Sequence, residues 1–492
     1  MEYEAVIGLE VHSQLLTRSK MFCECSTHYQ GSEGNTLVCP VCLGAPGTLP
    51  VINRQAVAFT IMTGLALGCS VAQYSKFDRK NYPYPDLMKG FQISQYDAPL
   101  CHDGWLDISD NGAAGRVGII RVHLEEDVAK LMHRADFSGE SYSLVDVNRS
   151  GAPLMEIVSH PDMRSPEQAR NYLMKLRSIL QYLGVSTCNM EEGSFRCDAN
   201  ISVRPRGSPE MFPRVEVKNM NSFKAVYQAL SHEIERQTAV VEGGRRVVQE
   251  TRGWLDDKGV TVSQRTKEFA HDYRYFPEPD LPPLQISGKW VEELKALLPE
   301  LPDARRRRLM SEYGLPAYDA AALTASRAMA DFFEATVRAK PLDGEPLVAR
   351  SKTVSNWALG ELAHLLNLHR LDIGDAKVRP HHLSEILDLI EEGIVSSSMA
   401  KELLQGVYQS GRSPREMVQE MGLIQVSDAT VLEQAAEQAI QANPQAVADY
   451  MKGKGPAVQY LVGQVMKLTK GRANPGLVNQ ALREKLEARR GH

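Results

Sequence analysis

The chain has 492 residues, more than one hydrophobic core usually holds, so its length predicts two to four domains. Its net charge of -5 excludes a chain that is basic throughout, so any surface that binds nucleic acid must be local. It has no apolar run of membrane-spanning length and no signal peptide at its start, and its eight cysteines include one cluster of four, which favours a reducing compartment. We therefore expect a globular protein of the cytosol that does not contact a membrane.

Four segments alternate between apolar and polar residues and therefore predict β-strands with one buried face: residues 6–15, 119–127, 196–204 and 214–218. If they share one sheet, their polar sides form a surface that we name the acidic face, made of Glu10, His12, Glu125, Asp198 and Glu216. Acids crowded on one sheet repel one another unless a cation lies among them, and carboxylates with one imidazole suit Mg²⁺ or Mn²⁺. The alternative is an antiparallel sheet whose polar side is simply solvated.

Two close cysteine pairs follow the first strand, Cys23 with Cys25 and Cys39 with Cys42. Two such pairs across a short loop can close the tetrahedral thiolate cage of a structural zinc site. Four unconnected buried cysteines are the alternative. We expect the metal to hold a loop in place rather than to take part in chemistry. The other cysteines are predicted to be core residues: Cys69, Cys101, Cys188 and Cys197.

The segment 76–95 is rich in aromatic residues, prolines and cations but has no periodicity, so it predicts an ordered loop. In this loop, Lys80 and Lys89 are candidates to bind phosphates. Tyr82 and Tyr84 are candidates to stack on a base, although an ordinary surface loop is an equal alternative for each of these residues.

Helices are predicted on both sides of a proline-rich segment. Residues 165–183 and 222–242 have apolar residues three and four apart, which predicts two helices that pack on the back of the sheet. The composition changes after the run 277–288 and the chain then reads as helical, so we place the main domain boundary near residue 293. The basic run 305–308 is interpreted as the solvated face of a helix.

A hinge is predicted at residues 410–414, followed by a smaller helical unit. From Lys452 onward nine Lys or Arg residues stand against two acids, Glu484 and Glu487, in a chain that is acidic overall. This local excess of cations is typical of a surface that binds nucleic acid, and its candidates are Lys452, Lys454, Lys467, Lys470 and Arg472.

Several common motifs are missing, which narrows the chemistry. The sequence has no Gly-x-x-x-x-Gly-Lys-[Ser/Thr] phosphate loop and no Gly-x-Gly-x-x-Gly motif. It also has no Gly-x-Ser-x-Gly elbow and no Ser/Lys or Cys/His arrangement that would mark an amidase. A bound nucleotide must therefore be held by metal-bound acids and by isolated Lys or Arg residues.

Taken together, these motifs resemble one family closely along the whole chain, the B subunits of the glutamyl-tRNA(Gln)/aspartyl-tRNA(Asn) amidotransferase. The resemblance rests on residues 7–15 (IGLEVHSQL), the four clustered cysteines, 80–97 (KNYPYPDLMKGFQISQYD), 123–127 (HLEED), 148–159 (NRSGAPLMEIVS), 195–205 (FRCDANISVRP), 215–223 (VEVKNMNSF), 271–283 (HDYRYFPEPDLPP) and 461–475 (LVGQVMKLTKGRANP). It implies an α+β protein with a kinase-like cradle domain built on an antiparallel sheet with a structural zinc site over residues 1–293. A helical domain over 294–410 and a small helical tail domain over 411–492 that binds tRNA would follow.

The reaction that the resemblance implies is ATP-dependent phosphorylation of the side-chain carboxylate of Glu-tRNA(Gln) or Asp-tRNA(Asn), after which ammonia displaces the phosphate. This is the chemistry of a ligase that forms C–N bonds with glutamine as the amido donor. The ammonia would come from a glutaminase A subunit in a heterotrimer with a small C subunit, and a non-discriminating aminoacyl-tRNA synthetase is a further candidate partner. The acidic face would supply the catalytic and Mg²⁺-binding residues, with Glu156 as a further Mg²⁺ ligand. Contacts to ATP or substrate would come from Lys80, Lys89, Asn200, Arg204 and Lys218.

Two other functions fit the sequence less well. A tRNA-binding scaffold without catalysis is disfavoured because anionic RNA would avoid the acidic face. A self-sufficient ligase that uses free ammonium on a small metabolite is disfavoured by the basic tail. The resemblance leaves both Glu-tRNA(Gln) and Asp-tRNA(Asn) open as substrates.

Overall fold

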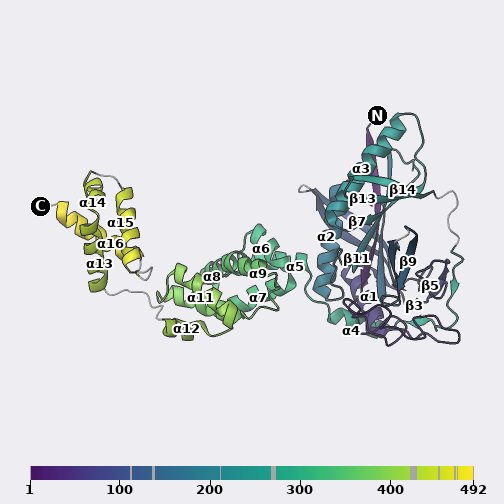
Figure 1. Ribbon diagram of the computed structural model, residues 1–492, viewed down its shortest axis with the longest axis horizontal. Helices are drawn as coiled ribbons and strands as arrows, with labels where there is room; N and C mark the ends of the chain where they lie inside the picture. The colour runs from purple at the N-terminus through teal and green to yellow at the C-terminus, as the bar shows by residue number, and fades with distance from the viewer. Residues whose placement is uncertain are drawn as a thin grey trace. The chain divides into compact units, whose positions relative to one another are not determined.

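The computed structural model describes residues 2–110, 113–135, 139–210, 212–266, 273–421, 429–452, 455–469, 473 and 475–490. The chain divides into two compact units, Met1–Leu301 and Pro302–His492 (Figure 1). The first unit contains the sheet, and the second unit is helical over its described residues. Among the described helices, none combines the length and the apolar character that crossing a membrane requires.

One large sheet organises the first unit. Within the described residues it has nine strands in the order β14 (Val260–Thr266), β13 (Glu250–Leu255), β12 (Val215–Met220), β11 (Phe195–Pro205), β1 (Tyr3–Gln14), β10 (Pro153–Ser159), β7 (Ala113–Glu126), β6 (Cys101–Asp110) and β2 (Ser70–Val71). Neighbouring strands are antiparallel except β12 and β13. The four strands predicted from alternation are parts of β1, β7, β11 and β12, so the prediction that they share one sheet is confirmed.

Smaller strand groups extend the first unit. The first of these groups contains β15 (Phe276–Pro277), β4 (Asp78–Asn81) and β5 (Phe91–Ser94). In the second, β16 (Leu284–Gln285) pairs with β3 (Tyr74–Ser75), and in the third, β8 (Lys130–Ala135) pairs with β9 (Ser141–Asp146). The segment 76–95, predicted as an ordered loop, therefore contains two short strands joined by a turn.

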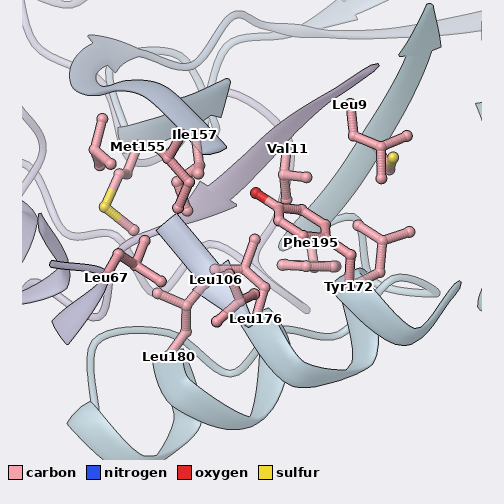
Figure 2. Close-up of a cluster of buried hydrophobic side chains, with 14 of the residues drawn as sticks. Leu9, Val11, Leu67, Leu106, Met155, Ile157, Tyr172, Leu176, Leu180 and Phe195 are labelled. Atoms are coloured by element: carbon pink, nitrogen blue, oxygen red, sulfur yellow. The ribbon is translucent and has the colours of Figure 1, made fainter. Parts of the chain in front are cut away.

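Three helices cover the apolar side of the sheet, α1 (Arg54–Ala66), α2 (Pro166–Leu183) and α3 (Phe223–Glu242), and α4 (Gly288–Ala296) packs on α1. Figure 2 shows Leu9, Val11 and Phe195 of the sheet packed with Tyr172 and Leu176 of α2. Since side chains alternate along a strand, the polar residues of β1 and β11 point away from this core.

The two helices predicted behind the sheet are confirmed as α2 and α3. The Ser165 side chain accepts the Gln168 N–H at 3.1 Å, which satisfies a free donor at the start of α2. The helix ends at Gly184, whose φ of 68° is a left-handed conformation that glycine adopts without steric cost. In α3 the Ser222 side chain has the same capping role.

The second unit has two hydrophobic clusters. The first cluster is built from α5 (Pro302–Glu312), α6 (Ala317–Thr324), α7 (Arg327–Arg338), α8 (Gly344–Trp357), the π-helical turn η1 (Ala358–Leu362), α9 (Ala363–His369), α10 (Pro380–Glu391), α11 (Ser397–Ser410) and α12 (Pro414–Met421). The second is built from α13 (Ala429–Ala442), α14 (Pro444–Met451), α15 (Pro456–Leu468) and α16 (Pro475–Arg490).

The predicted domain boundaries differ slightly from these packing units. The boundary at 293/294 falls inside α4, whose Leu294 packs in the core of the first unit. The boundary at 410/411 falls before α12, whose Met417 and Val418 pack in the first cluster of the second unit. The amino-acid composition changes at both predicted boundaries, but each preceding hydrophobic core extends a few residues past the change. The division into three functional domains stays a prediction.

The solvated helix face predicted for the basic run 305–308 is wrong for Arg305, which is buried. Its guanidinium donates to Glu334 Oε2 at 2.9 Å, and Arg308 and Arg338 reach Glu334 Oε1 at 2.8 and 2.9 Å. Tyr313 also donates to Glu334, at 3.2 Å. Burial alone would raise the pKa of Glu334, but Arg308 and Arg305 outweigh it and lower the pKa to about 2.

Glu334→Gln should lower the free energy of unfolding of the α5–α7 region by ~3 kcal/mol at pH 7, because it removes the buried negative charge that Arg305, Arg308 and Arg338 share. A carboxyl whose pKa is depressed on folding stabilises the fold above its unfolded pKa of 4.5, and this contribution is lost as the pH falls toward about 2. The wild type should therefore lose stability in that range, and the variant should lose less. Hydrogen exchange of α5 and α7 at several pH values would measure this. Glu312→Gln, which removes an exposed partner of Arg308, should behave as the wild type, and equal stability of both variants would contradict the prediction.

Candidate functional site

Strand register arranges the polar side chains of the sheet in rows, because directly paired residues of antiparallel strands point to the same side. Across β11, β1, β10 and β7, one row is Arg196, His12, Glu156 and His123. The next row is Asp198, Glu10, Val158 and Arg121. On the other side of the first row lie Gln14, Leu154 and Glu125 on β1, β10 and β7. The acidic face predicted from four separate strands is therefore one continuous surface, with β10 inserted at its centre.

A cleft of about 650 Å³ lies over this surface. Its floor is the sheet, and further lining residues come from segment 80–96 and from the chain near β15: Lys80, Tyr82, Gln92, Ser94, Gln95, Tyr96, Tyr273 and Tyr275. The rings of Tyr96 and Tyr275 stack with their centroids 4.3 Å apart. The cleft therefore combines a charged floor with an aromatic rim.

Three residues at the centre of the floor, His12, Glu125 and Glu156, form a group suited to a metal ion, which we name the metal-ligand group. Nε2 of His12 lies 3.5 Å from a carboxylate oxygen of Glu125 and 3.5 Å from one of Glu156, and the three ligand atoms lie within 4.8 Å of one another. His123 approaches Glu156 from the other side, at 3.2 Å. Ser94 donates to Glu125 at 3.3 Å. One imidazole with two buried carboxylates is a donor set that fits Mg²⁺ or Mn²⁺.

The pKa values in this group show strong coupling between the charges. Burial lowers the pKa of His12, but the charges of Glu156 and Glu125 outweigh it and raise the pKa to about 9. Burial would raise the pKa of Glu156, but His123 and His12 hold it well below its usual range. Glu156 is therefore ionised at neutral pH, as a carboxylate ligand must be, whereas His12 carries a proton that it must release to bind a divalent cation.

The remaining acids of the acidic face surround Lys218. Its Nζ forms an ion pair with Asp198 and lies 3.3 Å from an oxygen of Glu216. Asn200 donates to Glu10 at 2.8 Å. Burial, together with the charges of Glu156 and Asp198, raises the pKa of Glu10. Part of this shift comes from repulsion between neighbouring acids, and a cation bound among them would relieve that repulsion.

The two lysines predicted to bind phosphates lie in different pockets of the structure. Lys80 lines the cleft, with its Nζ 5.0 Å from the centroid of the Tyr273 ring. Lys89 instead forms an ion pair with the buried Glu126 and lines a different pocket, next to Cys23. Lys89 lies between β4 and β5 and is not among the residues that line the cleft.

The other residues predicted to contact ATP or substrate also differ in whether they line the cleft. Lys218 lines the cleft, whereas Arg204 donates to Glu4 at 2.7 Å and is not a lining residue. Asn200 is not a lining residue, but it donates a hydrogen bond to Glu10, which lines the cleft. Tyr82 lines the cleft and Tyr84 does not, and the stacking role of either residue stays a prediction.

Several residues of the cleft were not among the predicted site residues: Arg121, His123, Asp127, Arg196, Tyr273 and Tyr275. The first four lie on the polar side of the same alternating strands as Glu125 and Asp198, so strand period was a usable signal for them. Tyr273 and Tyr275 follow a segment without periodicity, and no local pattern indicates their position.

The four clustered cysteines come together as predicted. Their sulfur atoms lie within 4.8 Å of one another, so the cluster could hold a metal ion, and a tetrathiolate set fits zinc. The Cys39 N–H donates to Cys42 Sγ at 3.1 Å, and the buried Lys20 donates to the same sulfur at 3.5 Å. A hydrogen bond from Cys23 is the largest cause that lowers the pKa of Cys42 to about 4, and the charge of Lys20 contributes. The other cysteines are buried in the core, as predicted: Cys69, Cys101, Cys188 and Cys197.

Cys39→Ser should remove about one zinc per chain and destabilise the first unit, because a structural zinc site contributes to the free energy of folding. Metal analysis and thermal unfolding of the purified chain would measure both effects. Cys69→Ala, a change outside the cage, should keep the metal. A fully folded wild type without zinc would contradict the prediction.

The predicted tRNA-binding residues are only partly described by the structure. Lys452 and Lys467 are exposed on the second cluster of the helical unit. Lys454, Lys470 and Arg472 lie outside the described residues. The predicted role of this surface stays a prediction.

Two family models match the chain. Residues 5–292 match the GatB/GatE catalytic domain, and residues 331–486 match the GatB domain. The chain is 57% identical over 488 residues to the B subunit of the aspartyl/glutamyl-tRNA(Asn/Gln) amidotransferase of Dehalococcoides mccartyi (strain ATCC BAA-2266 / KCTC 15142 / 195), covering 99% of both chains. It is 57% identical over 486 residues to the B subunit of the same enzyme from Moorella thermoacetica, covering 99% of this chain and 100% of the relative. Because the identity exceeds one half along nearly the entire length of both proteins, the resemblance seen in the motifs is confirmed, and this chain belongs to the family of B subunits of the aspartyl/glutamyl-tRNA(Asn/Gln) amidotransferase.

Proposed function

We propose that this chain activates the side-chain carboxylate of Glu-tRNA(Gln) or Asp-tRNA(Asn) by ATP- and Mg²⁺-dependent phosphorylation in the cleft over the acidic face, and that the activated group is amidated there. The observation that carries this proposal is the group of His12, Glu125 and Glu156, a donor set for a hard divalent cation on the floor of a cleft. The match of residues 5–292 to a catalytic domain supports the same conclusion.

The chemistry requires activation because a carboxylate has no good leaving group. A carboxylate oxygen attacks the γ-phosphorus of ATP, the bond to the β–γ bridging oxygen breaks, and ADP leaves. The nitrogen of ammonia then attacks the carbonyl carbon, phosphate leaves with the former carboxylate oxygen, and the nitrogen loses a proton. The product is Gln-tRNA(Gln) or Asn-tRNA(Asn).

The roles of the residues follow from their positions. His12, Glu125 and Glu156, with Glu10, Asp198 and Glu216 beside them, would hold divalent cations, which neutralise the charge on phosphoryl oxygens when bound. Lys80 and Lys218 would contact phosphate groups from two sides of the cleft. Burial lowers the pKa of Lys218, but Asp198 and Glu216 outweigh it and raise the pKa above its ordinary value, so this lysine keeps its charge at neutral pH.

The ammonia would come from a partner. The sequence lacks the motifs of an amidase, so a separate glutaminase subunit would release ammonia, and a small third subunit would complete a heterotrimer. The names of the relatives, which describe one subunit of an amidotransferase, agree with this arrangement. The helical tail would bind the tRNA.

The test is phosphoryl transfer by the purified complex. With Glu-tRNA(Gln) and γ-labelled ATP, ADP formation should require Mg²⁺ and the misacylated tRNA, and hydroxylamine should trap the activated carboxylate as a hydroxamate. A tRNA-binding scaffold would form no ADP in this assay. A self-sufficient ligase would instead turn over free glutamate with ammonium.

A further inference from the structure

Arg196 is a cleft-lining arginine that a buried acid holds in place. It lies on β11 directly opposite His12 on β1, so its side chain points to the same side of the sheet as the metal-ligand group. One of its terminal nitrogens, Nη2, donates to Asp127 Oδ2 at 2.8 Å. The side chain is nevertheless 35% exposed, and it lines the cleft.

Asp127 is itself fixed on every side. Its side chain is 1% exposed, Gln14 donates to Oδ2 at 2.6 Å, and the Val128 N–H donates to Oδ1 at 2.9 Å. Arg149 lies 3.7 Å from Oδ1. Burial would raise the pKa of Asp127, but Arg196 and Arg149 lower it, so the carboxylate stays charged. Asp127 therefore has little freedom to move, and its structural effect is to orient Arg196.

This contact does not saturate the guanidinium. Asp127 accepts one of the five N–H groups of Arg196, and the buried Nε has no acceptor within the described part of the chain. Arg79 shows the contrast, because its Nε and Nη2 both donate to Glu278, at 2.7 and 2.8 Å. An arginine that is oriented by a buried acid and still has free donors in a cleft is suited to bind a planar oxyanion with two hydrogen bonds.

We propose that Arg196 binds the reacting oxyanion in the cleft and that Asp127 is its positioning residue. The oxyanion is either the carboxylate of the aminoacyl group or the phosphoryl group that it receives, since both present two oxygens to a guanidinium. Arg196 stands next to His12, so an anion that it holds lies beside the metal-ligand group. This inference rests on the proposed function and names a binding residue for it.

The test compares Arg196→Lys and Arg196→Ala with Arg116→Ala, which removes an exposed arginine paired with Asp107 on the same sheet outside the cleft. Arg196→Ala should lower kcat/KM of the complex by ~10²-fold, and Arg196→Lys should recover only part of it because an ammonium cannot form the paired contact. Added guanidinium ions should partly restore Arg196→Ala and leave Arg196→Lys unchanged. Arg116→Ala should match the wild type.

The substrate whose KM rises identifies the oxyanion. A higher KM for Glu-tRNA(Gln) indicates the carboxylate, and a higher KM for ATP indicates the phosphoryl group. Asp127→Asn should cause a smaller change in the same KM, because Arg196 keeps its charge but loses its orientation. Wild-type KM and kcat for both substrates in Arg196→Lys would overturn the inference, because this variant keeps the charge beside Asp127 and should fold.

Failure of the proposed function is distinguishable from failure of this inference. If the wild-type complex transfers no phosphate, the proposed function is wrong, and equilibrium binding then decides about Arg196. In that case the dissociation constants of ATP and of misacylated tRNA are compared between the wild type and Arg196→Lys. A weaker affinity for one of the two ligands supports the inference, and equal affinities for both overturn it.

Discussion

Asp198→Asn should slow the phosphorylation of Glu-tRNA(Gln) by at least ~10²-fold, because it removes a charge from a site that acts by electrostatic stabilisation. Asparagine has nearly the same shape as aspartate, and the neighbours of Asp198 on β11, Cys197 and Ala199, are buried on the opposite side of the strand. Lys218 keeps Glu216 as a partner at 3.3 Å. The sheet should therefore stay folded, because the fall in repulsion between the acids offsets the loss of the ion pair between Asp198 and Lys218.

Single-turnover phosphorylation by the purified complex would measure this rate. Glu125→Gln should have an effect of the same order, because Glu125 belongs to the metal-ligand group. The basal glutaminase activity of the partner should persist in both variants. Asp107→Asn, on the exposed part of the same sheet, is a matched control and should keep the wild-type rate. If Asp198→Asn and Glu125→Gln both react at nearly the wild-type rate, phosphorylation takes place elsewhere.

Removal of the chain after α12 should weaken the binding of tRNA and flatten its dependence on salt. The tail contains the predicted cations, of which Lys452 and Lys467 are exposed, and each phosphate contact releases counterions. Five such contacts correspond to a slope of log affinity against log salt of roughly four, which the truncated chain should lose. The structure places the cut after Met421 rather than at the predicted hinge, because Met417 and Val418 belong to the core of the preceding helices.

Binding of tRNA at several salt concentrations would be compared between complexes with the full-length and the truncated chain. Zinc content and unfolding of the first unit serve as checks that the cleft is intact. A full-length chain with its five predicted cations replaced by glutamine keeps the helices and should reproduce the flatter slope. If truncation changes neither affinity nor slope, the cations are merely solvated and the tail has no role in RNA binding.

The sequence by itself determined the local features of the site. Alternation with period two assigned Glu10, His12, Asp198 and Glu125 to the polar sides of strands, since a strand with one buried side must repeat every second residue. The spacing of Cys23, Cys25, Cys39 and Cys42 along the chain was by itself enough to predict one thiolate cage. Such patterns depend on neighbours in the chain, which is why they are readable without the fold.

Only the tertiary structure decided which of these residues meet. The place of β10 between β1 and β7 brings Glu156 between His12 and His123, and no local pattern specifies the order or register of strands so far apart in the chain. In the same way, Arg196 is oriented by Asp127 from another strand, whereas Lys89 is drawn to Glu126 and leaves the cleft. Burial and ion pairing between distant segments depend on the whole fold. The strands could therefore be predicted from the sequence, whereas the set of residues that line the cleft was decided by packing.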